Sequence, residues 1–176
     1  AASGVIVRED DPAAPERGIL LAGPAWGTEA FPRRLRDLYA TRLAHVAEED
    51  RVLLDAAAVD GISIDGEALS ALLDRQLLAV LRSLQRLYRE GGFVAPGPTG
   101  YRFANATIRE AIYQDLAPDL RRALHLNFAR HLEARKIGDA DPERIGLHWE
   151  RGADPTRARP YLRRAATLAI ARQEVA

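Results

Sequence analysis

The sequence contains no cysteine, which excludes disulfide bonds, thiol catalysis and thiolate metal ligands within its 176 residues. It contains no methionine either, even at position 1, so we expect a fragment of a longer protein. Among the 25 basic residues, Lys136 is the only lysine, and it lies in the stretch EARKIGD. A phosphate-binding loop needs a lysine in the context G-x-x-x-x-G-K-[ST]. The chain therefore lacks the loop of a P-loop ATPase.

Long hydrophobic runs are absent as well. No apolar stretch approaches the roughly 18 residues that span a bilayer, and the beginning of the chain lacks a signal-peptide pattern. We therefore expect a cytoplasmic protein without a membrane partner. The 25 basic and 25 acidic residues balance, so the net charge gives no argument for a polyanionic partner.

Three segments with different patterns follow one another. Residues 1–30 contain two strand-like stretches, GVIV and GILLAG, and are expected to form a β-hairpin or linker that leaves an upstream ATPase core. Residues 31–117 predict helices, the short strand ISI and a hairpin around PGPTG, in the order of a winged helix-turn-helix. Residues 118–176 predict helices only, like the opening of a tetratricopeptide-like repeat array. The predicted fold class is mainly α, a winged helix-turn-helix with a small β-hairpin followed by helical-repeat-like α-hairpins.

Helical spacing predicts which side chains are buried. Between residues 75 and 90 it places Leu77, Leu81, Leu84 and Tyr88 on the buried stripe. The other predicted stripes are Leu35, Leu38, Tyr39, Leu43 and Val46; Val52, Leu53, Ala56 and Ala57; Ile108, Ala111, Ile112 and Leu116; and Leu120, Leu124, Phe128 and Leu132.

Polar residues predict where several helices begin. Asp65 and Asp141 each precede a helical pattern and are expected to accept hydrogen bonds from unpaired backbone amides. Thr107 and Glu110 have the spacing of a capping box, with Thr107 as the cap and Glu110 reaching back. Asn105, just before this pair, is interpreted first as a turn and cap residue.

Catalytic and metal-binding patterns are weak. Ser63 in GISIDG is a near match to the nucleophile elbow G-x-S-x-G, but Asp65 replaces the second glycine, and we expect Ser63 to face solvent on a short strand. The four histidines, His45, His125, His131 and His148, form no metal-binding motif. We predict no catalytic and no metal-binding residue, and an enzyme built on Ser63 or a histidine is the weakest hypothesis.

Three arginines support a DNA-binding alternative. Arg82, Arg86 and Arg89 lie at i, i+4 and i+7 on the helix that would be the recognition helix of a winged helix. They could neutralise phosphates, or they could form a solvated face paired with acids. The segment offers only Gln76 and Gln85 for contacts with base edges.

The order of the motifs resembles a known family from about Phe31 to the C-terminus. The stretches LLDAAAVDGISIDGEAL, LLAVLRSLQRLYREGGFV, YRFANATIREAIYQDL and GLHWERGADPTRARPYLRRAATLA follow one another as in the signal-transduction ATPases with numerous domains. Bacterial members include ATPases fused to LuxR-type regulators. The resemblance implies a winged helix and initial tetratricopeptide-like sensor helices, with an upstream ATPase core and other protein domains as partners and ATP or ADP as ligand of the parent protein, but no cofactor in this fragment.

The resemblance also implies roles for individual residues. The strand-to-helix joint of the family carries a histidine similar to one that senses ADP, and Asn105 occupies that position here. Asparagine can donate a hydrogen bond to a phosphate but carries no positive charge. Arg109, Glu110, Tyr113, His125 and His148-Trp149 match the pattern. Arg109 lies in the first turn of the predicted helix and is expected to face a partner surface or only solvent. The leading hypothesis is a non-enzymatic regulatory fragment in which the winged helix acts as a nucleotide-state switch.

Overall fold

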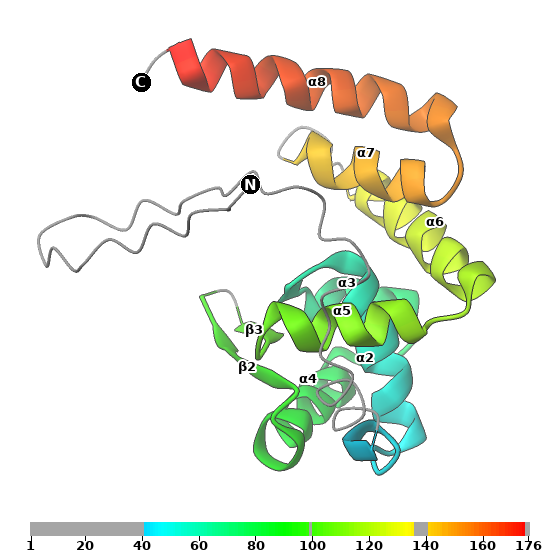
Figure 1. Cartoon of the computed structure of the whole chain (residues 1–176), viewed down its shortest axis with the longest axis vertical. Helices are drawn as coiled ribbons and strands as arrows, with labels where there is room; N and C mark the ends of the chain where they lie inside the picture. The colour runs from blue at the N-terminus through cyan, green and yellow to red at the C-terminus, as the bar shows by residue number, and fades with distance from the viewer. Residues whose placement is uncertain (1–40, 99, 136–140, 175–176) are drawn as a thin grey trace, which may run out of the picture. The chain divides into compact units, whose positions relative to one another are not determined.

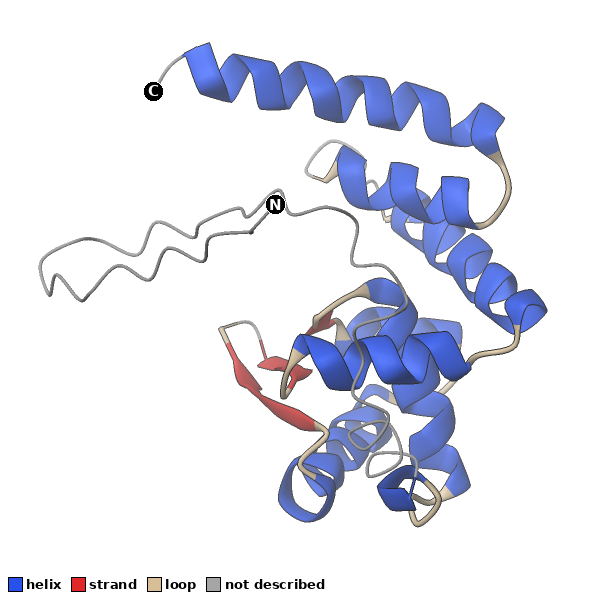
Figure 2. Ribbon diagram, in the orientation of Figure 1, coloured by secondary structure: helices blue, strands red, loops and turns tan. Residues whose placement is uncertain are grey.

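The computed structural model describes residues 41–98, 100–135 and 141–174, all within one unit that runs from Arg33 to Ala176. This part of the chain is mainly helical with a small antiparallel sheet, as predicted (Figures 1 and 2). The predicted strands in residues 1–30 and the beginning of the helix predicted from Phe31 lie outside the described residues. The elements are α2 (Glu48–Asp60), β1 (Ser63–Ile64), α3 (Gly66–Leu72), α4 (Leu77–Arg86), the π-helical turn η1 (Leu87–Gly91), β2 (Val94–Gly97), β3 (Gly100–Phe103), α5 (Ala106–Asp115), α6 (Pro118–Ala134), α7 (Pro142–Arg151) and α8 (Pro155–Glu174).

Helix α2 is the central buried helix of the first apolar core. Its first turn consists of three acidic residues, which the positive end of the helix dipole favours. Leu53, Leu54 and residues 56–59 are almost fully buried. The prediction placed Val52 on the same face, but Val52 is 42% exposed because Leu54 and Val59 occupy the buried side instead. Gly61, at a φ of 151°, ends the helix.

The sheet has the strand order β1-β3-β2, and both strand pairs are antiparallel. Ile64 lies opposite Tyr101, and Val94 lies opposite Phe103. The predicted hairpin around PGPTG and the predicted strand ISI are thereby confirmed. Gly100, with a φ of 126°, takes a conformation at the turn that a residue with a side chain rarely adopts.

Helix α4 contradicts the predicted buried stripe. Leu84 is buried, but Leu77 and Leu81 are each 40% exposed and Tyr88 is 46% exposed. The buried side is formed by Val80, Ser83, Leu84 and Leu87. A second apolar stripe with the same period therefore replaces the predicted one. Ser83 is accepted inside because its hydroxyl oxygen receives a hydrogen bond from Arg75 Nη2 at 3.1 Å.

The beginning of α5 corrects the predicted capping box. Helix α5 begins at Ala106, and the N-cap is Asn105, whose Oδ1 accepts a hydrogen bond from the amide of Ile108 at 2.8 Å. Thr107 therefore lies inside the first turn and is not the cap. Glu110 accepts hydrogen bonds from Arg109 and Gln114. The Glu110 carboxylate thus pairs with the side chains of the residue before it and of the residue four positions after it.

Helices α6 to α8 form the second part of the described chain. The Oδ1 of Asp141 accepts from the amide of Arg144 at 3.1 Å, which confirms the predicted cap of α7. In α6, Phe128 and Leu132 are buried as predicted, whereas Leu120, in the first turn, is 47% exposed. Helices α7 and α8 pack closely, since a Cβ on Gly146 would lie 2.7 Å from a methyl carbon of Leu162.

The described residues form two apolar cores. The larger core gathers side chains from α2, the sheet, α4, α5 and the middle of α6, and includes Phe93, Phe103 and Phe128. The smaller core lies among α6, α7 and α8, and its members are Ala129, Leu132, Ile145, Trp149 and Ala158. Within the described residues, no helix combines the length and the apolar character that a bilayer crossing requires.

Candidate functional site

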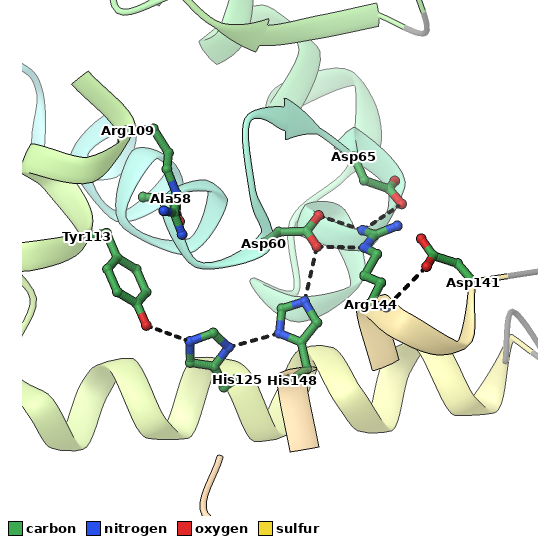
Figure 3. A network of polar contacts seen from close by, with 9 residues as sticks. All are labelled: Ala58, Asp60, Asp65, Arg109, Tyr113, His125, Asp141, Arg144 and His148. Carbon is green, nitrogen blue, oxygen red and sulfur yellow. Dashed lines mark hydrogen bonds and ion pairs between the residues drawn. The ribbon is translucent and has the colours of Figure 1, made fainter. Parts of the chain in front are cut away.

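A buried polar network lies where α2 and α5 meet α6 and α7. It consists of Asp60 at the end of α2, Tyr113 on α5, His125 on α6, and Arg144 and His148 on α7 (Figure 3). Arg144 and His148 are four residues apart, so they extend from the same face of α7. Asp60 is held at the last turn of α2, where Gly61 redirects the chain toward β1. The sequence thereby directs polar side chains from four helices to one place.

The hydrogen bonds form a continuous chain. Tyr113 Oη lies 3.0 Å from His125 Nε2, and His125 Nδ1 lies 2.9 Å from His148 Nδ1. His148 Nε2 in turn lies 3.2 Å from Asp60 Oδ1 (Figure 3). The residues His125 and His148 are 1% and 4% exposed, and the Asp60 side chain is 4% exposed. Bulk water therefore does not compete for these hydrogen bonds.

One arrangement of protons satisfies the whole chain with both histidines neutral. The Asp60 carboxylate accepts the proton on His148 Nε2, which leaves His148 Nδ1 as an acceptor. His125 Nδ1–H donates to that atom, and His125 Nε2 accepts from the Tyr113 hydroxyl. In this arrangement each O–H or N–H group donates one hydrogen bond, and each donates to the next residue along the chain from Tyr113 to Asp60. Because the two Nδ1 atoms face each other, the contact requires a proton on one of them only.

Asp60 is the negative end of the network. Its carboxylate receives Arg144 Nε at 2.8 Å and Arg144 Nη2 at 2.5 Å, the fork geometry in which arginine pairs best with a carboxylate. Burial by itself would raise the pKa of Asp60, but the hydrogen bonds from His148 and Arg144, together with the charge of Arg144, outweigh it. The pKa of Asp60 is therefore lowered, and the carboxylate is ionised.

His125 is kept neutral. Burial, followed by the neighbouring His148 and the positive charges of Arg151, Arg109 and Arg121, lowers the pKa of His125 to about 3. His148 also stacks on Phe128, with ring centroids 5.1 Å apart and an angle of 21° between the ring planes. The arrangement therefore suits a fixed connection between helices.

The other chemical candidates remain apart from one another. Ser63 is exposed on β1, and within the described residues none of the histidines forms a hydrogen bond with it. In the same part of the chain, no group of three or more histidine, aspartate or glutamate side chains is placed to hold a metal ion.

Asn105 is exposed, and its Oδ1 is already engaged as the cap of α5. The side-chain Nδ2 is therefore the group left to donate a hydrogen bond to a phosphate. This geometry agrees with the first interpretation of Asn105 as a cap. Its sensing role stays a prediction.

Arg109 lies against the body of the protein, with its side chain 18% exposed. Its Nε donates to the carbonyl oxygen of Ala58 at 2.7 Å, and its Nη1 pairs with Glu110 at 2.8 Å. Its guanidinium also lies 4.6 Å from the centroid of the Tyr113 ring, where a cation is attracted by the ring face. The structure thus gives Arg109 a set of internal contacts next to the buried polar network, and its contact with a partner stays a prediction.

The three arginines of the DNA-binding alternative differ in their surroundings. Arg86 Nε donates to Asp50 Oδ2 at 2.7 Å, and Arg86 Nη2 donates to Glu49 Oε1 at 2.8 Å. Arg82 on α4 and Arg89 in η1 are exposed. The charge of Arg86 is therefore largely balanced by acids of α2, while Arg82 and Arg89 face solvent.

Sequence reasoning named Tyr113, His125 and His148 but not the pairing of Asp60 with Arg144. A signal was present in the spacing of Arg144 and His148, two polar residues one turn apart on a helix that begins with a strong Asp-Pro cap. Nothing in the sequence joins them to Asp60, because 84 positions separate Asp60 from Arg144.

Comparison with known proteins gives no further assignment, since no protein-family model, curated protein or solved structure matches this chain.

Proposed function

We propose that this chain is a non-enzymatic regulatory element of a larger bacterial signalling ATPase or transcriptional regulator. In this proposal, residues 31–117 form a winged helix-turn-helix that acts as a nucleotide-state switch, and the helices after it form a protein-interaction arm. The order helix, strand, helix, helix and hairpin, with the sheet order β1-β3-β2, supports the winged-helix assignment.

The main observation behind this proposal is the exposed face of α4. On a winged helix that reads DNA this helix enters the major groove and presents polar and basic side chains. Here its surface contains Leu77 and Leu81, each 40% exposed, and Leu78, which is 57% exposed. Exposed apolar side chains grouped in this way indicate contact with protein. The upstream ATPase core is the proposed partner of Leu78, the most exposed of the three.

The buried polar network supplies the mechanical connection. Contacts between the winged helix and the core would stabilise a closed state with nucleotide bound, and loss of those contacts would shift the population to an open state. Tyr113 is hydrogen-bonded to α6 and Asp60 is hydrogen-bonded to α7. A movement of the winged helix would therefore also move the arm. Nucleotide sensing through Asn105 would use its Nδ2 atom.

A DNA-binding module is the second candidate, favoured by the exposed Arg82 and Arg89. Fluorescence anisotropy with a labelled mixed-sequence duplex, at low and at moderate salt, separates the two candidates. We expect no binding at either salt concentration. Binding that weakens steeply with salt and is lost in the double variant Arg82→Gln/Arg89→Gln would overturn the proposal.

The parent protein provides the positive test. We expect the reading frame upstream of residue 1 to encode an ATPase core, and we expect that core to bind this chain more weakly when Leu78 is replaced by Asp. An open reading frame without such a core would contradict the proposal.

A further inference from the structure

A groove of about 660 Å³ lies along β1 and beside α4 and the beginning of α7. Three apolar residues of its lining are exposed: Ile62, Leu77 and Leu81, at 41%, 40% and 40%. Leu77 and Leu81 come within 4 Å of the position that a Cβ on Gly66 would occupy, so they cover the beginning of α3. The groove is therefore open to solvent although much of its lining is apolar.

The rim of the groove is acidic. Asp65, Glu67 and Asp141 line it together with Asp60. Among the described residues, Arg144 is the only cation in the lining, and its guanidinium is engaged by Asp60. Glu67 pairs with an arginine outside the lining, and its side chain is still 64% exposed. The groove thus combines an apolar lining with an excess of carboxylates.

The second half of α8 has the opposite character. From Arg163 to Arg172 the sequence is RRAATLAIAR, which contains no acid. Leu168 and Ile170 are 37% and 58% exposed, and Arg163 and Arg172 are exposed as well. Helix α7 is ten residues long and α8 is twenty, so α7 covers only part of α8. This half of α8 is an exposed helix with apolar and basic side chains.

We propose that the groove of one molecule binds the second half of α8 of a second copy of this chain. Ile170 would lie on Ile62, Leu77 and Leu81, while Arg163, two turns earlier on the same face of α8, meets the acidic rim. This is the helix-in-groove mode of recognition, and ten helical residues span about 15 Å. The inference rests on the proposed protein-contact role of α4. It assigns Leu77 and Leu81, which line the groove, to a second copy of the chain, whereas Leu78, which is not part of the groove lining, is proposed to contact the ATPase core.

The contact joins two different surfaces, so it is heterologous: each molecule offers both a groove and a helix. A single short helix buries little area, and we therefore expect weak self-association that becomes visible in the range of about 10–500 µM. Since charge complementarity is part of the contact, association weakens as salt rises.

Sedimentation velocity of the complete chain over this concentration range tests the proposal. We expect the mean sedimentation coefficient to rise with concentration for the wild type. Leu81→Asp, which places a charge in the groove, and Ile170→Asp, which places one on α8, should each remain monomeric. The control Leu120→Asp changes a similarly exposed leucine, outside the groove, and should associate like the wild type.

Mixing the two variants gives the sharpest result. Leu81→Asp keeps an intact α8 and Ile170→Asp keeps an intact groove, so an equimolar mixture should form a heterodimer although neither variant associates alone. Circular dichroism of each variant confirms that it is folded. A wild type that is monomeric throughout, a mixture that stays monomeric, or equal loss of association in Leu120→Asp would each overturn the inference. None of these results affects binding to an ATPase core or to DNA, which test the proposed function separately.

Discussion

The two apolar cores formed by the described residues are maintained in different ways. The larger core is built from leucine, valine, isoleucine, alanine and three phenylalanines. Two polar side chains are buried on its helices α2 and α4, Asp50 and Ser83, and each accepts a hydrogen bond from an arginine. The smaller core contains five buried residues and depends on polar neighbours: Trp149 Nε1 and Tyr161 Oη both donate to Glu133 Oε1 at 2.9 Å. The buried polar network connects the two parts. Apolar packing stabilises each part, and directional hydrogen bonds fix how one part is placed on the other.

Removing the carboxylate of Asp60 should have the largest effect. Asp60→Ala leaves Arg144 and His148 without their partner, and breaking a buried pair in this way costs about 3–5 kcal/mol. The urea unfolding transition, followed by Trp149 fluorescence in a Trp26→Phe background, measures the loss. If the free energy of unfolding falls by less than about 1 kcal/mol, the Asp60–Arg144 pair contributes no more than an ordinary surface ion pair. Hydrogen bonds would then not be what fixes one part of the chain on the other.

Acidification should have the next largest effect, through His125. Its pKa is about 3 in the folded protein against an ordinary value of 6.5, so the unfolded chain binds more protons between these two values. Stability is therefore complete above pH 6.5 and falls as the pH decreases toward 3, by about 2 kcal/mol between pH 7 and pH 5. The lowered pKa of Asp60 adds a further loss only at lower pH, below the ordinary range of a carboxylate.

Urea unfolding at pH 7 and pH 5 checks this prediction. His125→Gln should be less stable at pH 7 and should lose most of the difference between the two pH values. His45→Gln, a replacement of an exposed histidine, serves as the control and should keep the difference. If His125→Gln retains the full pH dependence, His125 is not its source.

The cap of α5 should have a smaller effect, confined to the larger core. Asn105→Ala removes the acceptor for the amide of Ile108 and should cost about 1 kcal/mol. Asn105→Asp keeps the acceptor and should be close to wild type in thermal unfolding. Equal stability of the Ala and Asp variants would show that the side chain of Asn105 does not cap the helix.

The smallest effect is expected for a surface ion pair. Asp115 receives Arg51 Nη2 at 2.7 Å, but its side chain is 68% exposed. Asp115→Ala should change the free energy of unfolding by no more than about 0.5 kcal/mol. This variant is the matched control for Asp60→Ala, because each removes one carboxylate from an arginine.

The order of elements could be predicted because local signals determine it. Asp65 and Asp141 cap the helices that were expected to follow them, and the Pro and Gly residues of PGPTG form the turn of the hairpin. The buried side of α4 could not be predicted in the same way. Two apolar stripes with the same period compete on this helix, and only tertiary packing selects the one that contains Val80 and Leu87.

The site was predictable only in part for a related reason. Tyr113, His125 and His148 could be named from the sequence, but their partner Asp60 has the same local pattern as any acidic residue at a helix end. The pairing follows from the packing of α7 on α2 and α6, which joins residues more than 80 positions apart. Likewise, Asn105 and not Thr107 caps α5 because the helix begins two residues earlier than the capping box implies.

Hydrogen exchange of the wild type and of Asp60→Ala, compared amide by amide at pH 7, tests whether the buried polar network fixes the arm on the rest of the chain. We expect the loss of protection to be at least tenfold greater for the amides of α7 and α8 than for those of β3 and of residues 53–59 in α2. The amides of α2 and β3 keep their protection because both elements are part of the larger apolar core. Equal loss of protection in both parts, or no loss in α7 and α8, would contradict this account.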